Sequence, residues 1–516
     1  MKIINYIVKL IKINIILLAL LATALYAQNA EPANEEGAAV AEEGVKDEEV
    51  KADETLEPVL EYTPFSEMRP MERDRFITNR HSVDFGLSTS TSTYFDSSQD
   101  FSLLLGFYRP YVKYRLYDTA NLLLRPKVSV TQFIGSKTKK SSLSASIEQF
   151  SIGVMPHPDH TFVLGRQYAY IGKGLLFANY ADGLKYQGNY SFLKGNAYVL
   201  YSGQYAEDLC ALNLQGCGKN VVNPYNVVPG LPVDQQVFIQ PDTLGRRIIA
   251  MLEVSLPPLY GNTFSVGMLY AKDMIQYKLP NLTFATFNPV YLAFGLKGYI
   301  YTPDLRYNME LDVESGESYN IENQAQGVIL AAAYQADFSY ALPIYENIVK
   351  PNLLMQFAFA TGDSDKTNLV YPTQTNTKKT DNAFYYFGAY SGGLGLKPML
   401  SNMFIYRAGF SMRPAYSKYD FRNVYLVFKY SYYRKIVGEG VISDLRAYSH
   451  VNPGTLTSDE IVSKKYVGSG VDLTLLWKFK TELSFYYSLG LFIPGSAFPD
   501  SQKLDVVNLL SAAISF

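Results

Sequence analysis

From about residue 80 onward, the chain repeats one pattern of apolar and polar positions. Segments of roughly eight to fourteen residues alternate between the two and are bounded by turn residues, a pattern typical of transmembrane β-strands. No segment has a convincing helical period. The alternation predicts eighteen strands, at 81–94, 101–117, 121–133, 142–155, 160–170, 179–191, 194–206, 245–257, 261–271, 291–301, 305–315, 323–341, 350–362, 402–415, 420–434, 467–478, 480–492 and 504–516.

Pro110 and Pro126 fall in the interior of two predicted strands. Proline has no N–H to donate to a sheet ladder. Each of these strands is therefore expected to contain a bulge or to end early.

The lengths of the connections provide a check on the strand count. Connections after even-numbered strands are short, whereas those after odd-numbered strands include every long one: 207–244, 272–290, 363–401 and 435–466. Outer-membrane barrels have short periplasmic turns and long extracellular loops. The fold expected is all-β, a single transmembrane antiparallel barrel of about eighteen strands, with both termini in the periplasm of a bacterial outer membrane.

The region before the barrel divides into two parts. Residues 1–27 have lysines, then a short apolar run, then small residues, as in a cleaved secretory signal peptide, with cleavage after Ala24 or Ala27. A membrane anchor is the alternative. Residues 28–75 are predicted to be an acidic, disordered tether and linker, because 31–61 hold twelve acids and two lysines with almost no aromatic side chains. The barrel is assigned to 76–516.

Composition agrees with a barrel and argues against most other classes. The chain has 43 Tyr and 30 Phe, and only 18% of its residues are charged, which is unusual for a soluble enzyme of 516 residues. Two cysteines and four histidines leave little material for metal or acid–base chemistry. After residue 61 there are 41 bases and 36 acids, so the predicted barrel is basic although the whole chain carries a net charge of −2.

The last predicted strand ends in Phe516, which resembles the C-terminal signal recognised during outer-membrane barrel assembly. The expected partners are therefore outer-membrane lipid and the barrel assembly machinery. Cys210 and Cys217 lie in a long predicted loop of an exported chain, where thiols tend to be oxidised. A disulfide between them is expected, and two free thiols are the alternative.

The facing of charged side chains follows from the cost of about 2–4 kcal/mol for Arg or Lys at the lipid side of mid-bilayer. In 122–130, for example, Leu124 and Val128 claim the lipid side, so Arg125 and Lys127 turn inward. The same argument predicts a lumen lined by Arg109, Lys113, Arg115, Arg125, Lys127, Lys185, Arg247, Arg306, Arg407, Arg413 and Lys429. Acids also point inward, at Asp84, Glu148, Glu253, Glu310, Asp312, Glu314, Asp472, Glu482 and Asp505.

Several stretches resemble the alginate-export family of outer-membrane porins. In 160–186 the matching positions are Gly165, Arg166, Gln167, Gly172, Gly174, Asp182 and Gly183. FATGDSD at 359–365, GGLGL at 392–396 and the hairpin at 467–498 with Pro494 and Gly495 are also similar. The resemblance implies an eighteen-stranded outer-membrane channel and adds Arg166 to the basic lumen residues.

The function predicted is a porin that passes hydrophilic, anionic solutes or carboxylated saccharides by diffusion, because unpaired guanidinium groups attract carboxylates. Ion-paired rows that brace the wall without selectivity are the alternative. A surface adhesin on a barrel scaffold is the alternative function, and a TonB-dependent transporter would need a folded plug. The sequence indicates neither the solute nor an oligomeric state.

No enzyme, cofactor or nucleic-acid partner is indicated, and no catalytic residues are assigned. His157, Asp159 and His160 have a spacing that a metal could use, and Asp363 and Asp365 could hold Ca²⁺. Solvated turns are the preferred interpretation at both places, so no metal site is assigned.

Overall fold

The computed structural model describes most of the chain after residue 80. The described residues are 81–96, 101–116, 119–135, 139–202, 247–274, 287–320, 325–344, 348–364, 380–388, 390–414, 416, 423–440, 442, 464–479, 483–498 and 504–515. All of them belong to one compact unit, residues 61–516. The predicted signal peptide (1–27), the tether (28–75), Cys210, Cys217 and Phe516 lie outside the described residues.

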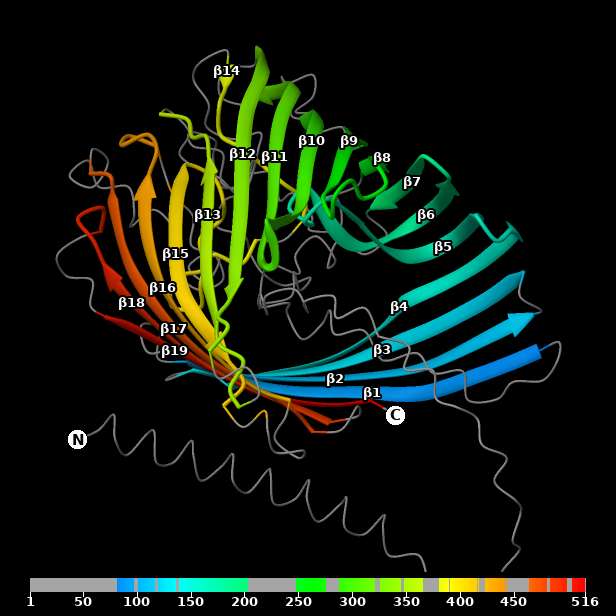
Figure 1. Ribbon diagram of the computed structural model, residues 1–516, viewed down its shortest axis with the longest axis horizontal. Helices are drawn as coiled ribbons and strands as arrows, with labels where there is room; N and C mark the ends of the chain where they lie inside the picture. The colour runs from blue at the N-terminus through cyan, green and yellow to red at the C-terminus, as the bar shows by residue number, and fades with distance from the viewer. Residues whose placement is uncertain are drawn as a thin grey trace, which may run out of the picture. The chain divides into compact units, whose positions relative to one another are not determined.

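The described strands form one sheet that closes on itself (Figure 1). Apart from β14, each strand pairs antiparallel with the strands before and after it in the ring, and β1 pairs with both β2 and β19. The strands are β1 (His81–Asp96), β2 (Phe101–Leu116), β3 (Ala120–Gly135), β4 (Lys139–His157), β5 (His160–Ile171), β6 (Phe177–Tyr190), β7 (Leu193–Ser202), β8 (Arg247–Ser255), β9 (Thr263–Asp273), β10 (Phe287–Ile300), β11 (Thr302–Asn320), β12 (Ala325–Ala341), β13 (Asn352–Ala360), β14 (Thr380–Asp381), β15 (Met403–Met412), β16 (Val424–Lys435), β17 (Tyr466–Phe479), β18 (Leu483–Pro494) and β19 (Asp505–Ser515).

One strand stands outside the ring. The two-residue β14 pairs in parallel with β12, while β13 pairs directly with β15. Without β14 the ring has eighteen strands, so the predicted closed antiparallel barrel of eighteen strands is confirmed. The sequence did not predict β14, because two residues are too few to show an alternation.

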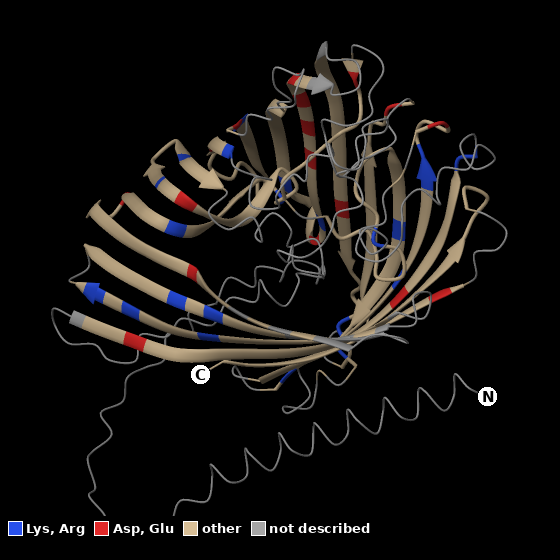
Figure 2. Ribbon diagram, turned by 180° about the vertical axis from the view of Figure 1, so that it is seen from behind, with Lys and Arg blue, Asp and Glu red and all other residues tan. Residues whose placement is uncertain are grey.

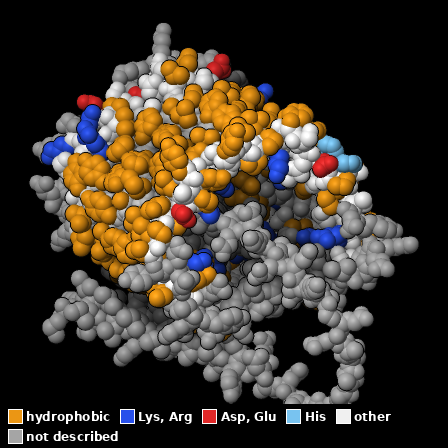
Figure 3. Space-filling model, viewed as in Figure 1, with side chains coloured by type: hydrophobic (Ala, Val, Ile, Leu, Met, Phe, Trp, Pro, Cys, Tyr) orange, Lys and Arg blue, Asp and Glu red, His pale blue; other side chains and the backbone are white. Residues whose placement is uncertain are grey.

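Side chains alternate between an exposed apolar face and a buried polar face. On β2, Tyr108 and Val112 are 48% and 47% exposed, whereas Arg109 and Tyr111 are 1% and 2% exposed. Figure 3 shows apolar side chains spread over the visible outer surface. This arrangement suits a wall with lipid outside and a polar lumen inside. In the described part of the chain, no helix is long and apolar enough to cross a membrane.

The two prolines disturb the ladder without ending their strands. Pairing between β2 and β3 is interrupted around Pro110, and the register of β3 against β4 shifts at Pro126. Arg125 pairs with Gln149 and Pro126 with Ile147, so Glu148 is the extra residue of a bulge. The bulge turns the buried Glu148 carboxylate toward the bases of β2 and β3.

The four longest connections all leave one end of the barrel. They follow β7, β9, β13 and β16, which are the seventh, ninth, thirteenth and fifteenth strands of the ring. Consecutive antiparallel strands run in opposite directions, so connections after odd-numbered ring strands share an end. The same end therefore carries the short loop between β5 and β6.

Candidate functional site: charged walls and inserted loops of the lumen

The first group of predicted lumen residues lies on β2, β3 and β4. The Nε of Arg109 is 3.0 Å from Glu148 Oε1, and the Nε of Arg125 is 2.9 Å from Glu148 Oε2. Arg125 also donates to the Tyr180 hydroxyl. One carboxylate is thus shared by two arginines, and all three side chains are nearly inaccessible.

The same wall carries further bases. Lys113 and Arg115 on β2 and Lys127 on β3 are half-buried, and each follows the alternation that buries Arg109 and Arg125. Lys113 lies opposite Asp84 in the register of β1 and β2, and Lys127 stacks over Phe107. We use the name basic wall for one set of side chains on β1 to β4: Arg109, Lys113, Arg115, Arg125, Lys127, Asp84 and Glu148. It carries five of the predicted bases and two acids.

A second group lies on β15, β16 and β17. Arg407 pairs with Asp472 at 3.2 Å, and Lys429 lies opposite Asp472 in the register while donating to Gln356. Two other predicted arginines pair with neighbouring strands, Arg166 with Asp182 at 3.2 Å and Arg247 with Asp273 at 3.9 Å. The remaining bases lie apart: Lys185 over Tyr198, Arg306 donating to the Pro303 carbonyl, and Arg413 over Tyr425.

The expectation of unpaired guanidinium groups is wrong for five arginines, Arg109, Arg125, Arg166, Arg247 and Arg407, since each has a carboxylate partner. All five are at most 9% exposed. A buried charge without a partner costs several kcal/mol, so burial demands the pairing. The alternative of ion-paired rows therefore describes these five arginines.

The opposite wall is acidic. Glu310, Asp312 and Glu314 follow one another on the inner face of β11 and are 2%, 0% and 0% exposed. β11 lies nine strands from β2 in either direction around the ring of eighteen. In Figure 2, blue segments mark Lys and Arg on the long strands at one side of the barrel, and red segments mark Asp and Glu along a strand at the other side. The lumen therefore has a basic and an acidic side.

Two connections fold into the lumen and meet there. They are the β5–β6 loop (172–176) and the inner segment (380–388 and 390–402). Phe387 N donates to the Leu176 carbonyl at 3.1 Å, and Gly388 N donates to the Leu175 carbonyl at 2.9 Å. The inner segment also binds the walls, because Tyr385 N donates to Glu314 and Leu394 N donates to Asp472.

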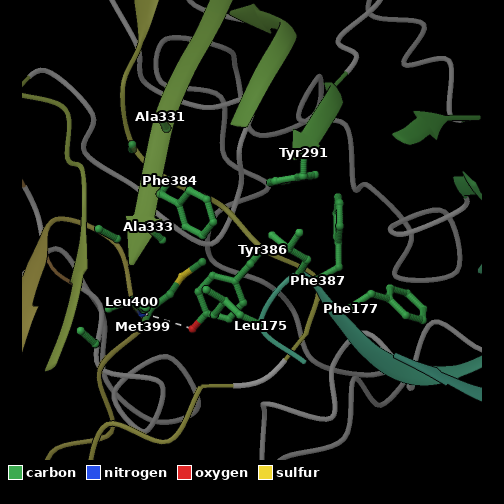
Figure 4. Close-up of a cluster of buried hydrophobic side chains, with 14 of the residues drawn as sticks. Leu175, Phe177, Tyr291, Ala331, Ala333, Phe384, Tyr386, Phe387, Met399 and Leu400 are labelled. Carbon is green, nitrogen blue, oxygen red and sulfur yellow. Dashed lines mark hydrogen bonds between the residues drawn. The ribbon is translucent and has the colours of Figure 1, made fainter. Parts of the chain in front are cut away.

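Apolar side chains hold the two loops against the wall. In Figure 4, Leu175 and Phe177 lie beside Tyr386 and Phe387, with Tyr291 of β10 nearby. All belong to one buried hydrophobic cluster. The Tyr386 hydroxyl accepts a hydrogen bond from Leu400 N, and burial raises the pKa of Tyr386 well above its usual value. The cluster narrows the lumen on the acidic side.

Sequence reasoning placed the inner segment in an external loop and missed its insertion. The available signal was the apolar run AFYYFG at 383–388, which is out of place in a solvated loop. Gly172 gave a second signal: its φ is +58°, and a side chain there would collide with the Glu310 carboxylate. A glycine at this position allows the β5–β6 loop to approach β11.

The weaker candidates form local turn contacts. His157 Nδ1 lies 3.3 Å from Asp159 Oδ2, and His160 contacts the Tyr186 hydroxyl at 2.9 Å. Asp363 accepts from Asn382 N at 2.9 Å. Among the described residues, no group of three His, Cys, Asp or Glu side chains is placed to hold a metal ion.

Part of the chain matches a known protein family. Residues 286–508 match the sequence model of the alginate export family. The resemblance is confirmed over those residues. Members of this family are channels rather than enzymes, so the match and the closed barrel support an outer-membrane channel. No curated protein sequence matches the chain.

Three solved structures align with most of the chain. Pseudomonas aeruginosa OccD3 (OpdP) is 10% identical with a TM-score of 0.48, covering 87% of this chain and 95% of its own. Pseudomonas aeruginosa OccK7 (OpdD) is 10% identical with a TM-score of 0.48, covering 84% and 98%. Pseudomonas aeruginosa OccK5 (OpdH) is 9% identical with a TM-score of 0.46, covering 84% and 98%.

Proposed function

We propose that this outer-membrane channel passes hydrophilic anionic solutes by passive diffusion along the basic wall. The observation that carries the proposal is the charge balance of that wall, which has five bases and two acids, Asp84 and Glu148, among the described side chains. Because two arginines share Glu148, the wall keeps a positive potential that concentrates carboxylates. The family name makes carboxylated saccharides the first solutes to examine.

Reversal potentials across a planar bilayer in asymmetric KCl test the proposal. The wild type is expected to prefer chloride, and the variant Lys113→Ala, Arg115→Ala, Lys127→Ala, which removes the three half-buried bases of the basic wall, is expected to lose that preference. Lys194→Ala, at an exposed base beside the β6–β7 turn, is the matched control and should keep it. Cation preference in the wild type would refute the proposal. Absence of discrete conductance steps would favour a scaffold for adhesion.

The proposal also orients the barrel, with the long connections outside the cell and both termini in the periplasm. Support comes from the four longest connections, which share one end of the ring. A peptide tag inserted within 203–246 should react with antibody on intact cells, whereas a tag after residue 516 should react only after permeabilisation. The reverse result would invert the orientation.

A further inference from the structure

Three carboxylates on β11, those of Glu310, Asp312 and Glu314, differ in the hydrogen-bond donors that they contact. Glu310 accepts from the backbone N of Lys173 at 2.7 Å, in the β5–β6 loop. Glu314 accepts from Tyr385 N at 2.9 Å, in the inner segment, and from the Tyr291 hydroxyl at 3.1 Å. The two inserted loops therefore cap the outer two acids of the row and leave Asp312 between them.

Asp312 has no such partner. It is 0% exposed, and neither of its carboxylate oxygens has a hydrogen-bond partner in the part of the chain that the structure describes. Its neighbours in register are Ala293 and Ala333, whose side chains cannot donate. Oε1 of Glu310, two residues earlier on the same face of β11, also lacks a hydrogen-bond partner among the described residues. Three buried carboxylate oxygens are thus left without donors, which is costly unless a ligand supplies donors or a carboxylate takes up a proton.

The surrounding charges are unbalanced in the same direction. Glu253 accepts from Gly172 N, and Lys173 Nζ pairs with Asp337 of β12. Glu310 feels the charges of Lys173, Glu253 and Asp337, and Asp312 feels those of Glu310 and Lys173. Among these charges Lys173 is the base, whereas Glu253, Asp337 and the pair itself are acids. An additional positive charge at this cluster of acids would therefore be attracted to it.

We propose that Glu310 and Asp312 form a binding site for a primary ammonium group of the transported solute, with Lys173 as a tethered competitor. An ammonium group has three N–H donors, which matches the three carboxylate oxygens without partners. Lys173 already brings such a group to the adjacent Asp337. The proposal rests on the proposed channel and adds an ammonium group to the solute class, beside the carboxylate that the basic wall attracts.

The chemistry of the cluster favours an organic cation over a metal ion. No group of three acidic, His or Cys ligands with metal-binding geometry occurs among the described residues. The site lies between two loop contacts, each made by a backbone N–H group. A solute that binds there must displace the β5–β6 loop. Lys173, which lies in that loop and pairs with Asp337, therefore lowers the apparent affinity of the site for the solute.

Single-channel block by 1,4-diaminobutane tests the site, with 1,4-butanediol as the uncharged probe of equal length. The diamine is expected to block the wild type reversibly and the diol to have no effect. Asp312→Asn, which keeps the shape, should weaken the block at least about tenfold, the worth of one charge-assisted hydrogen bond. Lys173→Gln should strengthen it several-fold and raise the open-channel conductance.

Matched controls separate this site from general charge effects. Asp304→Asn removes an exposed acid of β11, and Lys194→Gln removes an exposed base; both should leave the block within twofold of wild type. The proposal is overturned if the diamine blocks Asp312→Asn as strongly as wild type, or if it blocks Lys173→Gln more weakly than wild type. It is also overturned if Ca²⁺ blocks the wild type at the same concentration and the diamine does not. Lys173→Gln keeps the test decisive should Asp312→Asn not fold. A wild type that conducts without diamine block refutes only this site, whereas a barrel that does not conduct refutes the channel.

Discussion

Replacing Glu148 by Gln should increase the preference of the channel for anions. Glu148 is the acid that both Arg109 and Arg125 contact, at 3.0 and 2.9 Å. Its removal leaves Asp84 as the acid opposite five bases on the basic wall. One elementary charge about 7 Å from a permeating ion in water changes its energy by roughly 0.6 kcal/mol, close to RT. Local anion concentration should rise about 2.7-fold and cation concentration should fall by the same factor.

The assay is the reversal potential in asymmetric KCl, repeated at low and high total salt. We expect the permeability ratio of anion to cation to rise about sevenfold at low salt. At high salt the rise should be smaller, because the Debye length shortens. Asp304→Asn, which removes an exposed acid of β11, should change the ratio little. An unchanged ratio in Glu148→Gln, or a shift toward cations, would refute the reasoning that the two arginines contribute to selectivity.

The change should also cost stability, because Arg109 and Arg125 are 1% and 4% exposed and lose a charged partner. Breaking a buried ion pair costs about 3–5 kcal/mol. Urea unfolding followed by tryptophan fluorescence in detergent should show a lower midpoint for Glu148→Gln than for Asp304→Asn. Equal midpoints would mean that the bulge at Pro126 relaxes and exposes the arginines.

Three further outcomes are expected. Unboiled protein should migrate differently from boiled protein on detergent gels, and its circular dichroism should show β-structure with negligible helix, because backbone groups in lipid must pair within a closed sheet. Alkylation of unreduced, denatured protein should leave Cys210 and Cys217 unlabelled, consistent with a disulfide worth about 2–3 kcal/mol in the chain-entropy picture; labelling of both would exclude the bridge. Burial raises the pKa of Tyr386, so the neutral hydroxyl stabilises the inner segment below the ordinary tyrosine pKa of 10.0 and this contribution is lost as pH rises through the raised pKa. Open-channel conductance should therefore increase at strongly alkaline pH, and by less in Tyr386→Phe.

The sequence alone determined the wall of the barrel. Strand number, approximate bounds and the facing of residues such as Arg109 and Glu310 follow from a period-two alternation, which is a local property of the chain. The cost of turning a base toward lipid fixes the facing before any tertiary contact is known. The two prolines were likewise readable as disturbances, because the missing N–H is a property of the residue itself.

Only the tertiary structure decided which charges meet and where the lumen narrows. Glu148 bridges two arginines because a register shift at Pro126 adds one residue to β4, and register depends on pairing between strands. The inner segment enters the lumen because its aromatic side chains find the β5–β6 loop, which lies about 200 residues earlier in the chain. Asp312 is left between two capped acids for the same reason. Contacts between distant segments carry no periodic signal, so alternation along the chain predicts the wall and leaves the contents of the lumen to packing.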